Sequence, residues 1–226
     1  MQVKAVLFDL GGTLIKVTEI PHVMKSVLKD HEIDRSLEEI SQARAEAERD
    51  LDFQDLTKLL DEFWVQWNLR ILRNLQVNTN TRSLAEFVAT HWWNYSSVAL
   101  YPDAEKVLPL LKAKGFRTGV ITNGLQSDVD QILPKIGLQN FFDIIVVIDT
   151  LRKMKPDSQV FHHALRKLKI QPSEAIFIGD EIEADYKGAR NAQLTTYLID
   201  RDGKVNDESV NRISDLQDLL NLKIIK

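Results

Sequence analysis

The chain has 226 residues, no cysteine and a formal net charge of −4. This length suffices for one large domain, or for one domain with a smaller module, and the lack of cysteine excludes disulfides, thiolate zinc sites and cysteine nucleophiles. The mild acidity argues against a nucleic-acid-binding surface, and no apolar run is long enough to span a bilayer. We therefore expect a cytoplasmic protein without nucleic-acid or membrane partners.

The first predicted element is a buried strand over residues 3–8, an apolar run that is rich in β-branched residues and too short for a helix. The run ends at Asp9, and two glycines and Thr13 follow. Open α/β sheets place ligands at the C-terminal ends of their strands. There the glycine backbone can approach a ligand closely, and the Thr13 hydroxyl can bind a phosphate oxygen. The alternative interpretation is an ordinary turn in which Asp9 is a turn-forming residue.

Residues 16–99 are predicted to be mostly helical, with little that indicates a strand. The apolar spacing predicts helices over residues 21–29, 37–51, 56–75 and 81–97. An aromatic stripe at helical spacing is more often the core of a helix bundle than the wall of a substrate pocket. We therefore favour packing within the bundle, with the pocket as the alternative, for the four tryptophans of this block: Trp64, Trp67, Trp92 and Trp93.

From residue 101 onward, predicted strands and helices alternate. Asp103 can cap the first of these helices. Such alternation indicates right-handed crossovers and a parallel sheet with helices on both faces. We expect an α/β, Rossmann-like domain formed by residues 1–15 and 100–226, with residues 16–99 inserted as a helical cap. The later strands are expected at 117–122, 141–148, 175–178 and 195–199, and the helices at 103–115, 127–136, 157–168, around 184–189 and at 213–222.

Polar side chains follow the ends of several predicted strands. The carboxyl ends of parallel strands share one edge of the sheet, so these groups can converge. A carboxylate nucleophile needs a cation to hold an incoming phosphate near it, and Mg²⁺ typically binds one or two carboxylates while keeping several waters. The residues concerned are Asp9, Thr13, Thr122, Asn123, Lys155, Asp180 and Asp185.

In this order and spacing, the motifs resemble those of haloacid dehalogenase superfamily hydrolases. The resemblance covers nearly the whole chain and includes the position of the helical cap between the first and second motifs. It implies Mg²⁺-dependent hydrolysis of a small phosphorylated metabolite through an aspartyl-phosphate. The four matching segments are Asp9-Leu10-Gly11-Gly12-Thr13, Thr122-Asn123-Gly124, Lys155-Pro156-Asp157, and Gly179-Asp180 with Asp185.

The resemblance also implies a role for each matching residue. Asp9 would be both the nucleophile and a metal ligand, and Lys155 would neutralise Asp9 and the phosphoryl oxygens. The other metal-binding groups would be the Gly11 carbonyl, Asp180 and Asp185, and the other substrate-binding side chains would be Thr13, Thr122 and Asn123. Glu181 could reach the site, but a solvated acid in the first turn of a helix is the favoured interpretation.

The first motif departs from the usual phosphatase pattern at Gly11. Phosphatases of this superfamily usually carry an aspartate there, which protonates the leaving group. The superfamily's dehalogenases also lack this acid, but they need no metal and do not keep the acidic fourth motif. The sequence therefore favours a Mg²⁺-dependent phosphatase of low activity. A metal-free 2-haloacid dehalogenase and a catalytically weak relative that binds a phosphometabolite or a protein remain alternatives. The substrate and the oligomeric state are left open.

Overall fold

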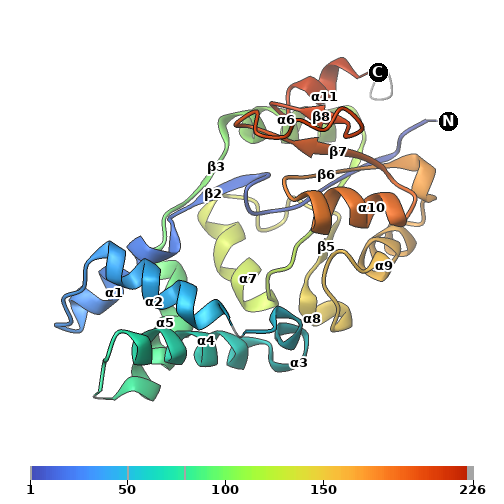
Figure 1. Ribbon diagram of the computed structural model, residues 1–226. Helices are drawn as coiled ribbons and strands as arrows, with labels where there is room; N and C mark the ends of the chain where they lie inside the picture. The colour runs from blue at the N-terminus through green and yellow to red at the C-terminus, as the bar shows by residue number, and fades with distance from the viewer. Residues whose placement is uncertain (1, 50, 79, 223–226) are drawn as a thin grey trace.

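A computed structural model describes residues 2–49, 51–78 and 80–222. Its centre is a parallel six-stranded sheet with the order β5–β4–β1–β6–β7–β8 (Figure 1). Strand β1 lies in the middle and pairs with β4 and β6, which confirms the predicted α/β sheet. The strands are β1 (Ala5–Phe8), β4 (Arg117–Ile121), β5 (Ile144–Val146), β6 (Ala175–Gly179), β7 (Thr195–Ile199) and β8 (Arg212–Ile213).

Helices cover both faces of the sheet, as a parallel sheet requires. Successive side chains of a strand point to opposite faces. Val6 and Phe8 accordingly pack in one cluster with α6, α7 and α11, whereas Ala5 and Leu7 pack in another with α9 and α10. The helices of this part are α6 (Pro102–Ala113), α7 (Gln126–Lys135), α8 (Ile148–Leu151), α9 (Ser158–Leu168), α10 (Gly188–Asn191) and α11 (Asp218–Asn221).

The helices between residues 16 and 99, which we call the helical insertion, pack around a cluster of their own. They join the sheet through the antiparallel ribbon β2–β3, in which Ile15 pairs with Leu100. This ribbon was not among the predicted elements, but it adds only short strands at the two ends of the block, which agrees with the expectation that the block contains little strand. Across the described residues, no helix has both the length and the apolar character that crossing a membrane requires. The elements are β2 (Ile15–Val17), α1 (Ile20–Asp30), α2 (Leu37–Arg49), α3 (Leu56–Leu59), α4 (Asp61–Asn74), α5 (Thr81–Tyr95) and β3 (Val98–Leu100).

The helix predicted over residues 56–75 is broken at Leu60, whose φ is 52°. The break separates α3 from α4, so that Leu56 and Phe63 join one cluster with Leu125 and Ile148. Leu125 and Ile148 follow β4 and β5, and the helical insertion therefore rests on the C-terminal edge of the sheet. Figure 1 shows α3 beside α8 at this contact.

Two further helices differ from the prediction. Residues 212–213 form β8 beside β7 instead of starting the last helix, which is reduced to α11. The helix expected around residues 184–189 begins as a π-helix over Ile182–Lys187. Isolated π-turns occur most often at functional sites, and this one carries Asp185.

An ion pair between Asp103 and the half-buried Arg201 joins α6 to the segment that follows β7. The Asp103 carboxylate accepts hydrogen bonds from Arg201 and from the Leu216 N–H, each at 2.8 Å. The Arg201 guanidinium also donates to the Thr13 carbonyl at 2.8 Å and lies 3.7 Å from the ring centroid of Tyr101. Because Tyr101 is the N-cap of α6, the prediction that Asp103 caps this helix is wrong. Asp103 instead connects distant segments.

Asp103→Asn is expected to lower the free energy of unfolding at pH 7 by about 1–3 kcal/mol. Burial alone would raise the pKa of Asp103, but hydrogen bonds from Arg201 and Leu216 hold it below the usual 3.8. A depressed folded-state pKa gives stability that is present above the unfolded pKa and is lost as the pH falls through the folded value. Urea unfolding from pH 7 to pH 2 should show the two proteins converging, and a constant difference would contradict this assignment.

Candidate active site

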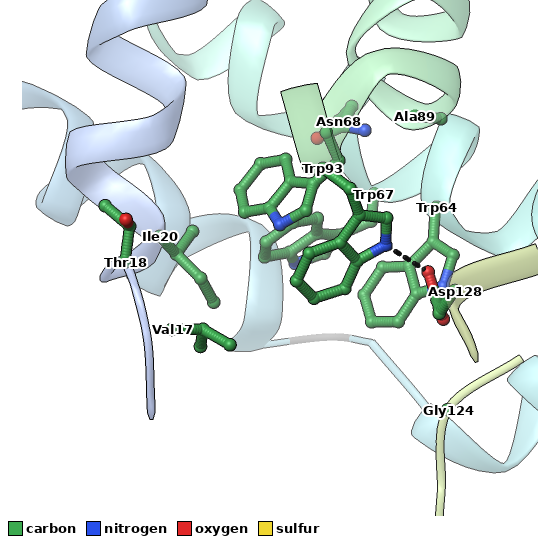
Figure 2. A pocket seen from close by; sticks show the side chains of 11 residues that line it. Val17, Thr18, Ile20, Trp64, Trp67, Asn68, Ala89, Trp93, Gly124 and Asp128 are labelled. Carbon is green, nitrogen blue, oxygen red and sulfur yellow. Dashed lines mark hydrogen bonds between the residues drawn. The ribbon is translucent and has the colours of Figure 1, made fainter. Parts of the chain in front are cut away.

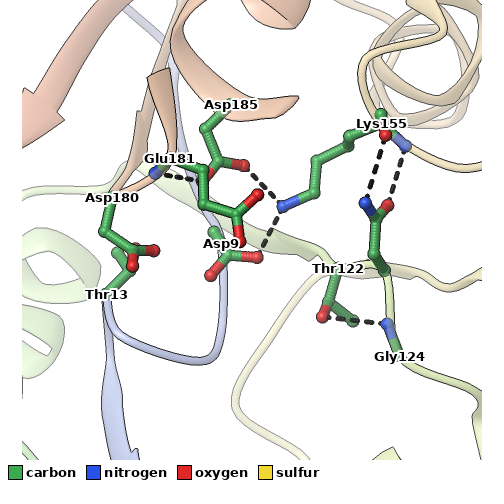
Figure 3. Close-up of polar contacts among 9 residues, drawn as sticks. Asp9, Thr13, Thr122, Gly124, Lys155, Asp180, Glu181 and Asp185 are labelled. Carbon is green, nitrogen blue, oxygen red and sulfur yellow. Dashed lines mark hydrogen bonds and ion pairs between the residues drawn. The ribbon is translucent and has the colours of Figure 1, made fainter. Parts of the chain in front are cut away.

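The predicted site residues lie at the C-terminal edge of the central strands. Asp9 follows β1, Thr122 follows β4 and Asp180 follows β6, while Lys155 lies in the loop between α8 and α9. Figure 3 shows the Lys155 side chain reaching from this loop toward Asp9 and Asp185, with Thr122 on the other side. The parallel topology thus brings together side chains from four separate stretches of the chain.

The ammonium of Lys155 is buried between two carboxylates. Its Nζ lies 2.5 Å from Oδ1 of Asp9 and 2.5 Å from Oδ1 of Asp185, and all three residues are buried. Burial alone would lower the pKa of Lys155, but the two carboxylates reverse this effect and raise the pKa far above its ordinary range. The lysine is therefore charged at physiological pH.

Asp180 adds a third carboxylate to the cluster. Its Oδ1 accepts a hydrogen bond from the Thr13 hydroxyl at 3.1 Å, and carboxylate oxygens of Asp9, Asp180 and Asp185 lie within 4.8 Å of one another. Burial and the charge of Asp185 raise the pKa of Asp180 to about 6. Burial also raises the pKa of Asp9 to about 7, although Lys155 opposes the rise. Desolvation is the main cause of both shifts, although the Asp180 residue is exposed overall, and the neighbouring carboxylate of Asp185 adds to both.

The donor set fits a divalent cation. Three carboxylates and one ammonium leave a formal charge of −2, which one such ion would balance. Mg²⁺ prefers oxygen ligands and uses only one or two carboxylates alongside water. Asp9, Asp180 and Asp185 are the side chains that could hold it. The Gly11 carbonyl as a further ligand stays a prediction.

Two glycines let the carboxylates come this close together. Gly12 has φ +75°, and a Cβ at this position would lie 2.2 Å from Oδ2 of Asp180. A Cβ on Gly179 would lie 2.3 Å from Cγ of Asp185. The Asp185 carboxylate is also fixed by the Glu181 N–H, which donates to its Oδ2 at 3.0 Å. The Glu181 side chain itself is exposed.

Asn123 has a role that the sequence analysis missed. Its Oδ1 accepts a hydrogen bond from the Lys155 N–H at 2.7 Å, and its Nδ2 donates to the Lys155 carbonyl at 3.1 Å. The side chain therefore holds the loop that carries the lysine. Thr122 Oγ1 accepts from the Gly124 N–H at 3.2 Å, which leaves the hydroxyl proton able to donate elsewhere. Contacts of Thr122 and Asn123 with a phosphoryl group stay predictions.

The four tryptophans of the helical insertion both pack and line a cavity, while a role in binding substrate stays a prediction. Trp67 is buried in the helix packing, and Trp64 and Trp92 pack against the same cluster. All four also line a cavity of about 290 Å³, which we call the tryptophan cavity (Figure 2). The favoured interpretation, packing within the bundle, is therefore incomplete.

A sequence profile of haloacid dehalogenase-like hydrolases matches residues 3–193, which contain every motif of the site. The chain belongs to this family of hydrolases. A glyceraldehyde 3-phosphate phosphatase from Methanopyrus kandleri is 27% identical over an alignment of 224 positions that covers 96% of this chain and 91% of that protein.

Solved structures of other hydrolases in this family share the fold across nearly the whole chain. YfnB from Bacillus subtilis, bound to magnesium, gives a TM-score of 0.77 at 20% identity and 98% coverage of both chains. A 2-haloacid dehalogenase from Pseudomonas syringae gives 0.72 at 24% identity and 97% coverage of both. Phosphatases and dehalogenases thus both occur among the relatives of this hydrolase, and fold alone does not separate them.

Gly12→Ala and Gly11→Ala form a matched pair that tests the geometry of the carboxylate cluster. At Gly12 the new methyl group collides with Asp180, and the left-handed backbone adds about 1–2 kcal/mol of strain. We expect a lower melting temperature and weaker Mg²⁺ binding in calorimetric titrations. At Gly11 a Cβ meets nothing within 4 Å and the φ is not left-handed, so the melting temperature should match that of the wild type. Equal Mg²⁺ affinity in the two variants would contradict the close approach of Asp180.

Proposed function

We propose that this hydrolase is a Mg²⁺-dependent phosphatase of small phosphorylated metabolites that works through an aspartyl-phosphate on Asp9. The observation that carries the proposal is the buried cluster in which Lys155 contacts Asp9 and Asp185 while Asp180 lies beside them. Its excess negative charge suits a divalent cation, and a metal with a lysine can neutralise a phosphoryl group. The phosphatase relative from Methanopyrus kandleri and the magnesium bound to YfnB support it.

Each residue of the cluster would have a defined part in the reaction. When bound, Mg²⁺ would supply positive charge beside the transferred phosphoryl oxygens. Lys155 favours the ionised form of Asp9 and fixes its Oδ1, which leaves Oδ2 to attack phosphorus while the bond from phosphorus to the ester oxygen breaks. The leaving oxygen keeps the electron pair of that bond and takes a proton from water. The Thr122 hydroxyl would donate a hydrogen bond to a phosphoryl oxygen. Water then hydrolyses the acyl phosphate, which releases inorganic phosphate and restores the Asp9 carboxylate.

A metal-free haloacid dehalogenase is the second candidate function. Gly11 favours it, because dehalogenation needs no acid for the leaving group, and the fold likeness to the Pseudomonas syringae enzyme is compatible with it. The carboxylate cluster opposes it. A 2-haloacid is itself an anion. Without a metal, three carboxylates and a single lysine leave the site negatively charged, and this charge would repel the acid. The charge of the site therefore favours the phosphatase.

Metal removal separates the two functions. Hydrolysis of 4-nitrophenyl phosphate should require Mg²⁺ and should stop when EDTA is added, whereas chloride release from 2-chloropropionate should stay at background. Asp9→Asn is the control: it should abolish phosphate release and retain a cooperative melting curve, because the substitution preserves side-chain shape at a strand end. Chloride release that survives EDTA and is lost in Asp9→Asn would establish the dehalogenase instead.

Gly11→Asp should raise turnover of alkyl phosphates more than that of aryl phosphates. The new carboxyl would protonate a poor leaving group, and such general acid catalysis is typically worth ~10²–10⁴-fold. The backbone permits the change, because Gly11 is not left-handed and a Cβ there meets open space. The measurement is kcat on butyl phosphate and on phenyl phosphate, with Gly11→Ala as the control. A folded Gly11→Asp protein with unchanged kinetics on both esters would show that another group supplies the proton, or that phosphate is not the substrate.

A further inference from the structure

The tryptophan cavity lies between the helical insertion and the edge of the sheet that carries the site. Its walls include Trp64 and Trp67 of α4, Trp92 and Trp93 at the end of α5, Gly124 just before α7, and Asp128 in the first turn of α7. Figure 2 shows the indole rings grouped together, with Trp93 donating from Nε1 to Asp128 across the interface. The cavity is thus a largely aromatic chamber that both the insertion and the segment after β4 help to line.

Gly124 lies at the side of this chamber that is nearest to Thr122 of the candidate site. It lines the cavity, and its N–H donates to the Thr122 hydroxyl oxygen beside Lys155 and Asp9 (Figure 3). An ester whose phosphoryl group lies at Asp9 and Thr122 can therefore direct its leaving group past Gly124 into the chamber. The cavity volume of about 290 Å³ is near the lower end of the range for small-molecule pockets.

The lining of the cavity is mainly apolar. Among the residues that line it, Nε1 of Trp64, Nε1 of Trp67 and Oδ1 of Asn68 have no hydrogen-bond partner within the described residues, but these three atoms are buried within the packing. Trp67 and Asn68 are 3% and 2% exposed. The side chains therefore present mainly their apolar parts to the cavity, which suits an apolar group such as a ring.

Gly11 restricts the leaving group independently of the cavity. The first motif offers no acid at this position, so the departing oxygen must be stable as an anion. A phenol meets this requirement far better than an aliphatic alcohol does. Faces of indole rings favour offset or edge-to-face contact with another ring. Two separate features, an acid-free first motif and an aromatic chamber, therefore select the same kind of molecule.

We propose that the substrates are aryl phosphate monoesters, whose ring enters the tryptophan cavity. This proposal rests on the phosphatase function above. A carboxylate oxygen of Asp9 forms a bond to phosphorus while the bond from phosphorus to the aryl oxygen breaks. The phenolate leaves with the bonding electron pair and takes a proton from water. Hydrolysis of the acyl phosphate then returns Asp9 to its carboxylate.

Filling the cavity tests the proposal. Ala89→Leu puts three further carbons into the chamber, and Ala45→Leu makes the same change at an exposed position of α2. Ala89→Leu should lower kcat/KM for 4-nitrophenyl phosphate by about tenfold or more, the usual effect of small volume changes in an apolar pocket. Acetyl phosphate has a good leaving group and no ring, so its kcat/KM should change less than about twofold. Ala45→Leu should match the wild type on both.

The two proposals fail in different ways. An Ala89→Leu protein that hydrolyses both esters as the wild type does would overturn the aryl assignment alone. Absence of Mg²⁺-dependent turnover on every phosphate ester would overturn the phosphatase function instead. Calorimetric titration with 4-nitrophenol tests the cavity without catalysis: binding should occur in the wild type, weaken at least severalfold in Ala89→Leu, which fills the cavity, and persist in Ala45→Leu. A wild-type protein that does not bind 4-nitrophenol would refute the aryl assignment.

Discussion

One buried ammonium between two buried carboxylates holds together the edge of the sheet that carries the candidate site. The three residues come from separate parts of the sequence. The Nζ atom of Lys155 lies 2.5 Å from a carboxylate oxygen of Asp9 and 2.5 Å from one of Asp185. Removing the lysine would leave two unpaired negative charges in a poorly solvated place, and breaking a buried ion pair in this way typically destabilises a protein by about 3–5 kcal/mol. The loop that carries Lys155 must therefore be held accurately, and the amide of Asn123 holds it through two backbone hydrogen bonds.

The sheet and the helical insertion contribute different kinds of chemistry. The strand ends supply charge, and they are rigid because β1 is buried on both faces and paired on both sides. The insertion supplies apolar surface and indole N–H groups, and it meets the sheet through Leu56 and Phe63. A reacting group at the edge of the sheet would thus have a polar environment on one side and an aromatic one on the other.

The sequence predicts those features that depend on local pattern and on general topology. Asp9 and Asp180 could be placed because each ends an apolar strand, and parallel strands share an edge. The bonds from Asn123 to the Lys155 backbone could not be predicted, because they join loops 32 residues apart and involve no motif of their own. The break at Leu60 was equally hidden: its neighbours suit one continuous helix, and only contacts with Leu125 and Ile148 account for the kink.

The separation of partners along the chain also explains why the β2–β3 ribbon was not predicted and why Asp103 was predicted to cap a helix. Strands β2 and β3 have three residues each and are about eighty positions apart, so neither has a local hydrophobic pattern long enough to identify it. Asp103 occupies a favourable place for a helix cap, yet Arg201 and Leu216 compete for its carboxylate from almost one hundred residues or more away. In each case a tertiary partner overrides a local preference.

The position of Arg201 has a consequence for how the two parts of the molecule can move. Its guanidinium contacts the Thr13 carbonyl just before the first crossing to the helical insertion and the Tyr101 ring just after the second. The two chain connections between the sheet and the helical insertion are also hydrogen-bonded to each other. The Tyr101 N–H donates to the Leu14 carbonyl, and the Thr18 N–H donates to the Ser97 carbonyl. Two connections joined in this way act as a single pivot. Any displacement of the helical insertion relative to the sheet would therefore move both connections together, because separating them would break these hydrogen bonds.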